Sequence, residues 1–301
     1  MPRLNRFLII KHMTPLIVQH LKELNKNIFS LSEMKLILSK NREKWAIPKI
    51  TTANEFIDVL KDKGVIEEIV IDTPQREITK YIFGEASPYD IALSIRKGSY
   101  LSHYSAVFSH QLTENVPKTI YTNVEQSPKY TANRDEELQQ EDIDLAFSRP
   151  MRLTNQIATF SFRGKEYKVY LLNGKNHNRL GVEKIQTFNL SKPSYITNIE
   201  RTLIDIVVRP AYSGGVEEVL QAFKEAKGKY SVNRMLSYLK KMEFKYPYHQ
   251  LIGFYLEKAG YEEKVLNLLN KFEIKYNFYL TYQISEKEFS ERWRVYYPKG
   301  L

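Results

Sequence analysis

The sequence predicts an α+β fold: a small N-terminal domain, a mixed α/β middle region and a helical C-terminal bundle that ends in a strand. Three observations support this. Within residues 1–83, two helix-start motifs are followed by two alternating apolar strands. Residues 155–172 alternate as a second hairpin around an Arg-Gly turn. Residues 198–272 carry apolar side chains at helical spacing through most of their length.

The composition is that of a globular protein with a basic surface. At 301 residues the chain is long enough for two or three small domains. It has no cysteine, which excludes disulfides and thiolate metal ligands, and its net charge of +10 is compatible with nucleic-acid binding. No stretch approaches the roughly 18 apolar residues that span a bilayer, and the N-terminal apolar run is too short for a signal peptide. We therefore expect a cytoplasmic protein without membrane contact.

Residues 1–83 are predicted to form a winged helix-turn-helix domain. Residues 14–25 carry a helical apolar stripe. Two capping boxes mark the next helix starts, Ser30 with Glu33 and Thr52 with Glu55. Two strands then follow, residues 65–71 and 78–83, on either side of a proline-containing turn. Three helices followed by a hairpin are typical of winged-helix DNA-binding domains, whose third helix enters the major groove.

Polar and basic side chains at the start of the third helix and on the hairpin predict a DNA-binding surface. Asparagine can bond to adenine on two edges, whereas lysine and arginine mostly neutralise phosphates. The predicted DNA-binding residues are Lys49, Thr51, Thr52, Asn54, Lys61, Gln75, Arg76 and Lys80. Because Glu55, Asp58 and Asp62 lie on the same helix, a winged helix that docks only protein stays an alternative.

Residues 84–191 are predicted to mix helices with a small sheet. The expected helices are residues 85–96 and 99–111, and the expected strands are residues 117–124, 155–162, 165–172 and 182–190. His103 and His110 are seven residues apart, which is too far for the i, i+4 pair of a helical metal site. We expect neither a metal site nor another cofactor.

One acidic pattern in this region offers an enzymatic alternative. Asp142 and Asp144 resemble the paired metal-binding aspartates of nucleotidyltransferases, but the Gly-Ser helix start that precedes such pairs lies far upstream, at Gly98-Ser99. Asp144 with Glu166 and Lys168 matches the loose acid/Glu-x-Lys pattern of restriction-type nucleases, on a hairpin where side chains alternate outward in any case.

Residues 192–301 are predicted to be mainly helical, organised around residues 198–226. The first helix there is almost entirely apolar, which is typical of a core helix, apart from Arg201, Asp205 and Arg209. These three are four residues apart and can pair as a ladder on one face. Gly214 and Gly215 open the next helix, where backbone amides could meet an anion. Spacing leaves two interpretations open, a structural ladder and a recognition surface.

Three more helices are expected in this region, residues 231–242, 248–259 and 262–272, followed by a strand at the C-terminus. Short loops between them predict an antiparallel bundle. A lysine-rich stretch that includes Lys240 and Lys241 makes this the most basic surface of the chain, although a solvated face is its simplest interpretation.

Four segments together resemble the AbiEi family of bacterial antitoxins: SYLSHYSAVFSHQL, ERTLIDIVVRP, YSGGVEEVL and WRVYYP. The resemblance implies that residues 1–83 repress the chain's own promoter through inverted repeats in double-stranded DNA. It also implies that residues 84–301 counter a nucleotidyltransferase-like toxin of the same phage-defence (abortive-infection) operon without forming a stable complex with it. The candidate antitoxin surface is Glu200, Arg201, Asp205, Arg209, Gly214, Gly215, Lys240 and Lys241.

We therefore expect a DNA-binding autorepressor and antitoxin rather than an enzyme. The alternative is a metal-dependent nuclease or nucleotidyltransferase of a defence locus that uses Asp142, Asp144 and Glu166.

Overall fold

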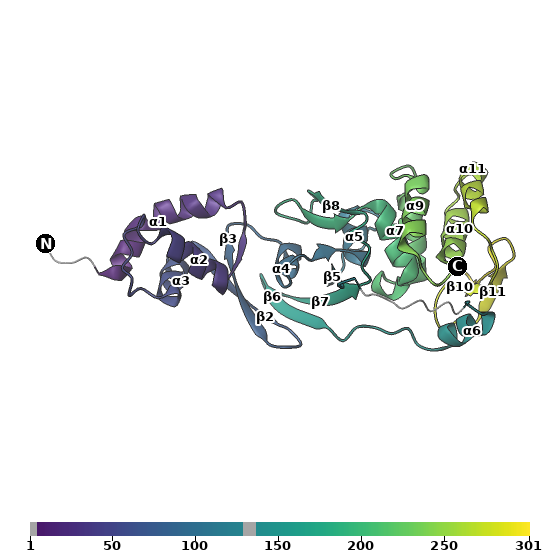
Figure 1. Cartoon of the computed structure of the whole chain (residues 1–301), viewed down its shortest axis with the longest axis horizontal. Coiled ribbons are helices and arrows are strands. Elements are labelled where there is room, and N and C mark those ends of the chain that lie inside the picture. The colour runs from purple at the N-terminus through teal and green to yellow at the C-terminus, as the bar shows by residue number, and fades with distance from the viewer. Residues whose placement is uncertain (1–4, 129–136) are drawn as a thin grey trace. The chain divides into compact units, whose positions relative to one another are not determined.

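The computed structural model describes residues 5–128 and 137–301, and the chain divides into two compact units (Figure 1). The N-terminal unit contains residues 1–97, 156–169 and 189–192. The C-terminal unit contains residues 98–155, 170–188 and 193–301. Neither unit is continuous in sequence, because part of the middle region folds with the N-terminal helices.

The N-terminal unit combines helices with antiparallel strands. Its helices are α1 (Arg6–Glu23), α2 (Leu31–Asn41), α3 (Ala53–Asp62) and α4 (Pro88–Ser94). Its strands are β1 (Ile28–Ser30), β2 (Ile66–Asp72), β3 (Glu77–Phe83) and β6 (Ile157–Phe162), together with residues 165–169 of β7, a strand that extends over Lys165–Gly174. Their hydrogen-bonded order is β1-β3-β2-β6-β7, with β2 and β3 paired over their whole length.

Both predicted capping boxes are confirmed. Before α2, the Ser30 hydroxyl accepts from the backbone of Glu33, whose carboxylate accepts from the Ser30 amide in return. Thr52 and Glu55 make the same reciprocal pair before α3. Each box satisfies two amides that would otherwise be unpaired at the helix start, which is why the sequence located these two helices accurately.

The first helix is longer than the sequence predicts. It was expected to begin at residue 14, whereas α1 begins at Arg6 and runs through Pro15. Proline removes one helical hydrogen bond, but Ile10 and Ile17 on either side of it are fully buried. Their burial in the core of the unit, around Trp45, stabilises the turns that proline weakens.

The C-terminal unit has two sets of strands and most of the helices. Residues 170–174 of β7 begin the first set, whose hydrogen-bonded order is β7-β5-β4-β9-β8. The second set is a separate sheet with the order β10-β12-β11. The strands are β4 (Tyr100–Leu101), β5 (Thr119–Glu125), β8 (Val182–Ile185), β9 (Ser194–Thr197), β10 (Phe278–Tyr279), β11 (Lys287–Ser290) and β12 (Val295–Pro298). The helices are α5 (His103–Ser109), α6 (Gln140–Ser148), α7 (Ile199–Val208), α8 (Val216–Glu225), α9 (Val232–Met242), α10 (Tyr248–Lys258) and α11 (Glu263–Leu266). Short 3-10 turns follow α7 and α11, at Pro210–Tyr212 and Asn267–Lys271.

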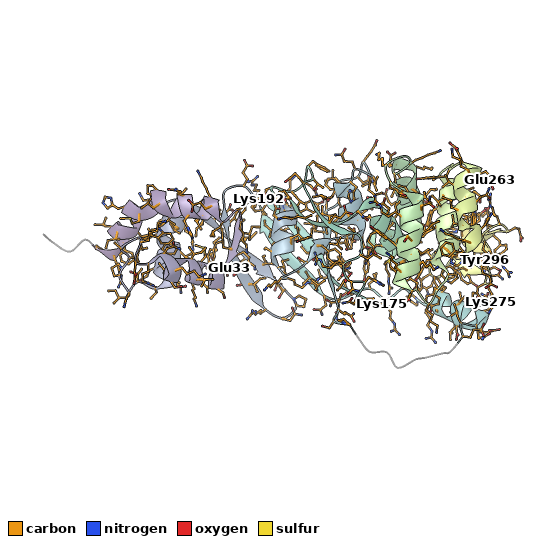
Figure 2. The ribbon with its side chains drawn as sticks, turned by 45° about the horizontal axis from the view of Figure 1, so that its top comes forward. Glu33, Lys175, Lys192, Glu263, Lys275 and Tyr296 are labelled. Carbon is orange, nitrogen blue, oxygen red and sulfur yellow. The ribbon has the colours of Figure 1, made fainter. Side chains whose placement is uncertain are left out.

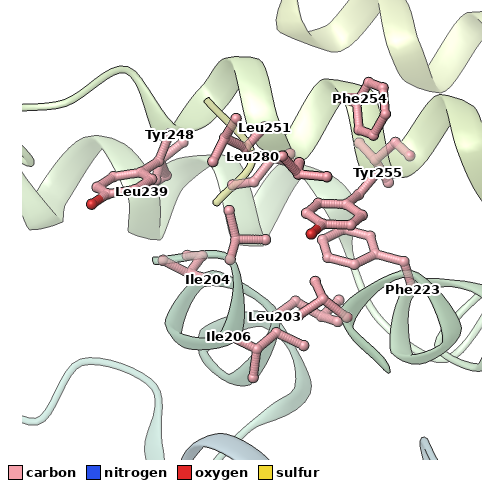
Figure 3. Packing of buried hydrophobic residues seen from close by; sticks show 14 of the residues in the cluster. Leu203, Ile204, Ile206, Phe223, Leu239, Tyr248, Leu251, Phe254, Tyr255 and Leu280 are labelled. Carbon is pink, nitrogen blue, oxygen red and sulfur yellow. The ribbon is translucent and has the colours of Figure 1, made fainter. Parts of the chain in front are cut away.

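Helix α7 lies in the core of this unit, as its apolar sequence predicts. Figure 3 shows its residues Leu203, Ile204 and Ile206 meeting side chains of the neighbouring helices, among them Phe223 of α8 and Leu251 of α10. All five are almost completely buried. The predicted α+β class is confirmed, and within the described ranges no helix is long and apolar enough to cross a membrane.

Candidate functional site

The start of α3 presents part of the predicted DNA-binding set to solvent. Lys49, Thr52 and Asn54 are exposed there. Thr51 is only 1% exposed, so its side chain faces the interior and is not available to a base edge. The Thr52 hydroxyl accepts from the Glu55 amide, which leaves its hydrogen free to donate outward.

Two arginines that the sequence did not single out support this edge of α3. The guanidinium of Arg42 donates to the carbonyls of Pro48 and Thr51, at 2.5 and 3.0 Å, and fixes the segment that leads into the helix. Arg6 of α1 pairs with Glu55 at 2.5 Å. The backbone of Thr52 and the charge of Arg6 both lower the pKa of Glu55, so its carboxylate is ionised and offset by a cation.

The predicted contacts on the hairpin side are partly engaged within the unit. Lys61 bonds to Glu68 at 2.6 Å, and Gln75 donates to Gln156 at 2.6 Å. Lys80 is half-buried, and desolvation lowers its pKa, so a phosphate contact there is less favourable. Arg76 is exposed at the turn. The predicted residues best placed for a ligand in solution are therefore Lys49, Thr52, Asn54 and Arg76.

The hairpin itself is covered along one edge. Strand β2 pairs with β6 through Asp72 and Thr159, in addition to its full pairing with β3. The sequence predicted the two strands of the wing but not this third strand, because β6 lies about 85 residues further along the chain and local patterns carry no information on such pairing.

In the C-terminal unit, half of the predicted charge ladder forms, and it forms in the interior. Arg201 and Asp205 are 2% and 7% exposed, with 2.8 Å between Nε and Oδ1. Arg201 also donates to the Leu180 carbonyl at 2.8 Å and lies 3.9 Å from a carboxylate oxygen of Glu125. Burial works against a charged guanidinium, but these acids outweigh it and raise the pKa of Arg201.

Arg209 and Glu200 do not join this pair. Arg209 follows the last residue of α7, and its side chain forms no ion pair with the residues that the structure describes. Glu200 is 2% exposed and accepts from the guanidinium of Arg234 and the amide of Ser231, at 2.7 and 2.9 Å. Glu200, Arg201 and Asp205 thus stabilise the interior. Contact with another molecule would fall to the other residues of the predicted antitoxin surface.

The Gly214-Gly215 turn is already satisfied within the chain. Both glycines have positive φ, and the Gly215 amide donates to the Pro210 carbonyl at 2.9 Å. In the first turn of α8, Glu218 accepts from three side chains, including Tyr104 at 2.9 Å. An acid of the chain itself therefore occupies the helix start where the sequence suggested an external anion. Lys240 and Lys241 are exposed on α9.

The acids of the enzymatic alternative have structural partners. Asp142 caps α6 by accepting from the Gln139 amide. Asp144 accepts from Gln140 and from the Tyr279 hydroxyl, both at 2.9 Å. Glu166 is exposed on the part of β7 that belongs to the N-terminal unit. Over residues 5–128 and 137–301, no group of three or more His, Asp or Glu side chains is placed to hold a metal ion.

Comparison with known proteins bears on the fold alone. No protein-family model matches the chain, and no curated protein matches it. Among solved structures, it is similar to the crystal structure of the RV2827C protein from Mycobacterium tuberculosis, with a TM-score of 0.56 and 13% identity. The match covers 93% of this chain and 89% of that one, so the shared fold extends over nearly the whole length of both proteins.

Proposed function

We propose that this protein is a DNA-binding transcriptional autorepressor that also acts as the antitoxin against a nucleotidyltransferase-like toxin of a phage-defence operon. The observation that carries the proposal is the order of elements in the N-terminal unit. A helix, a short strand, two helices and a hairpin follow one another, and β1 pairs with β3 antiparallel. This is the order of a winged helix-turn-helix domain, in which α3 is the recognition helix.

The exposed side chains at the start of α3 suit the major groove. Asn54 has the amide group that can bond to adenine, and Lys49, just before the helix, would neutralise a phosphate of the DNA backbone. Because Arg6 offsets Glu55, the acid nearest to these residues opposes phosphate approach less than the sequence suggests. Arg76 at the hairpin turn would supply a further phosphate contact.

A recognition surface of this size favours a paired arrangement on DNA. Only a few residues of one chain would reach the bases, and single small modules gain affinity and register from a second half-site. We infer that two copies bind the two halves of an inverted repeat in the promoter of the chain's own operon.

The antitoxin part of the proposal rests on the resemblance of the C-terminal segments to AbiEi antitoxins. Of the predicted antitoxin residues, Arg209, Lys240 and Lys241 have side chains that reach solvent to some degree. These residues are the first to test for toxin neutralisation. Both activities would take place in the cytoplasm, without a membrane partner.

The test separates the two activities with substitutions in the full-length chain. A fragment that starts at residue 84 is unsuitable, because it would remove β2 and leave β6 without that partner. Instead, Lys49→Ala/Asn54→Ala should abolish repression of a promoter reporter but still rescue growth when toxin and antitoxin are expressed from unrelated promoters. The matched control, Lys240→Ala/Lys241→Ala, changes two exposed residues far along the sequence and should still repress the reporter.

Two results would contradict the proposal. One is full repression by the Lys49→Ala/Asn54→Ala variant, which would remove α3 from DNA recognition. The other is failure of soluble wild-type protein to rescue growth from an unrelated promoter, which would reduce its role to repression.

A further inference from the structure

The C-terminal unit contains a cavity to which the proposed function assigns no ligand, although Arg209, one of the residues proposed for toxin neutralisation, lines it. Its volume is about 400 Å³, within the range of small-molecule sites. Residues from α5, β7, α7 and the loops around them line it, among them His103, Lys175, Arg201, Asp205, Arg209 and Tyr212. Lys175, labelled in Figure 2, follows the last residue of β7.

The lining is cationic at neutral pH. Four cationic side chains face one acid: Arg152, Lys175, Arg201 and Arg209 against Asp205. The two histidines add no charge, because burial lowers the pKa of His103 to about 4 and also lowers that of His177. Only Arg201 of the four cations forms an ion pair with the residues that the structure describes. Over residues 5–128 and 137–301, Lys175 reaches no acid and donates to the Glu243 carbonyl at 3.4 Å.

The acid in the cavity is half satisfied. Oδ1 of Asp205 accepts from Arg201, whereas Oδ2 is buried without a hydrogen-bond partner among the described residues. A buried carboxylate oxygen without a donor is costly, and native proteins rarely leave one so. The unpaired oxygen therefore points to a donor that enters from outside the chain.

We propose that this cavity binds a small phosphorylated molecule of nucleotide size. Its phosphate would lie at Arg152, Lys175 and Arg209, and a hydroxyl or amino group would donate to Oδ2 of Asp205. Three cations that have no acidic partner in the described part of the chain suit a dianionic phosphate better than the single charge of a carboxylate. Tyr212 and Phe244, which also line the cavity, would supply apolar contacts for the rest of the ligand.

This site is independent of DNA recognition, since every lining residue belongs to the C-terminal unit. Loss of promoter binding would leave the proposal intact, and loss of ligand binding in the Lys175→Gln variant would leave promoter binding intact.

Calorimetry on the full-length protein tests the proposal, with a chelator present and at physiological salt. The probes are AMP, inorganic pyrophosphate, adenosine and glutamate. We expect AMP to bind and adenosine, which lacks the phosphate, to bind at least about tenfold more weakly, as loss of a charge-assisted contact implies. Lys175→Gln and Arg209→Gln should each weaken AMP binding about tenfold or more. The control Lys224→Ala/Lys229→Ala removes two exposed lysines outside the cavity and should leave affinity within about twofold.

Asp205→Asn tests the second contact. It should weaken AMP binding while leaving pyrophosphate, which lacks the donor groups of a nucleoside, equal or tighter. The proposal is overturned if neither AMP nor pyrophosphate binds. It is also overturned if glutamate binds more tightly than AMP, or if the lysine control weakens binding as much as Lys175→Gln does. Because Lys175 is exposed, its substitution is informative even where Arg209→Gln reduces the yield of folded protein.

Discussion

The buried pair of Arg201 and Asp205 gives the sharpest stability prediction. Replacing Asp205 with alanine removes the carboxylate that lies 2.8 Å from the Arg201 guanidinium and leaves a cation that is 2% exposed. One-sided disruption of a buried ion pair typically costs about 3–5 kcal/mol of unfolding free energy. The Leu180 carbonyl and the Glu125 carboxylate remain near Arg201, so we expect the lower end, about 3 kcal/mol.

A loss of this size is measurable in two ways. Urea unfolding followed by circular dichroism should give the free-energy difference, and the melting temperature should fall by roughly 6–12 °C for a unit of this size. Asp144→Ala is the matched control, since it removes an exposed aspartate that also accepts two hydrogen bonds. It should cost about 1 kcal/mol or less.

A double substitution isolates the pair itself. Arg201→Met with Asp205→Ala removes both charges, so it should cost less than the sum of the two single changes, with an interaction energy of roughly 1–3 kcal/mol. If Asp205→Ala melts within error of the wild type, the pair does not hold α7 in place. Additive single changes would likewise show that the two residues act independently.

Three further predictions concern other parts of the chain. Lys49→Ala/Arg76→Ala should weaken binding to all DNA sequences and reduce the slope of log affinity against log salt by about 2, as two lost phosphate contacts would; an unchanged slope would refute this docking. His103 is neutral when folded, with a pKa near 4 against about 6.5 unfolded, so its contribution to stability falls as pH drops from 6.5 to 4. Asparagine tolerates the positive φ of this position and has no imidazole to protonate. Between pH 6.5 and 4 the unfolding free energy of His103→Asn should therefore fall less steeply than that of the wild type, by about 1.4 kcal/mol per pH unit. The same pH dependence of the unfolding free energy in both proteins, measured by urea unfolding, would contradict this. Gly253→Ala should destabilise by more than about 1 kcal/mol despite the better helix propensity of alanine, because its Cβ would lie 2.3 Å from the ring of Trp293; an unchanged or higher melting temperature would contradict that packing.

The sequence predicted best where local chemistry determines the structure. The capping boxes at Ser30 and Thr52 define their helix starts through contacts made within three residues. The apolar run of α7 predicted a buried helix because nearly every face of it is hydrophobic. In both cases the information lies in adjacent residues.

Features that depend on distant residues were missed. Residues 140–148 form α6, which was not predicted, and its Phe147 packs on Phe278 and Tyr282 from the far end of the chain. The single expected C-terminal strand is one of three, because β12 pairs with β10 and β11. Short strands such as β9 carry too few residues for a periodic signal.

In the candidate site, too, the features that depend on adjacent residues were predicted and those that depend on distant residues were not. Exposure of Lys49 and Asn54 follows from the local geometry of a helix start. Burial of Thr51 and engagement of Lys61 by Glu68 depend on packing that the spacing of residues does not reveal. The cavity beside Asp205 combines residues from several elements, so no single stretch of sequence indicates it.

Binding of the full-length protein to the DNA upstream of its own operon tests the central claim most directly. In a fluorescence anisotropy titration at physiological salt, we expect affinity for this DNA to exceed that for a scrambled duplex by about 10³ or more, with two half-sites protected in a footprint. Asn54→Ala should reduce that preference by about tenfold or more, as loss of a bidentate base contact would. Equal affinity for the upstream and scrambled duplexes would contradict the claim that this protein is a sequence-specific autorepressor.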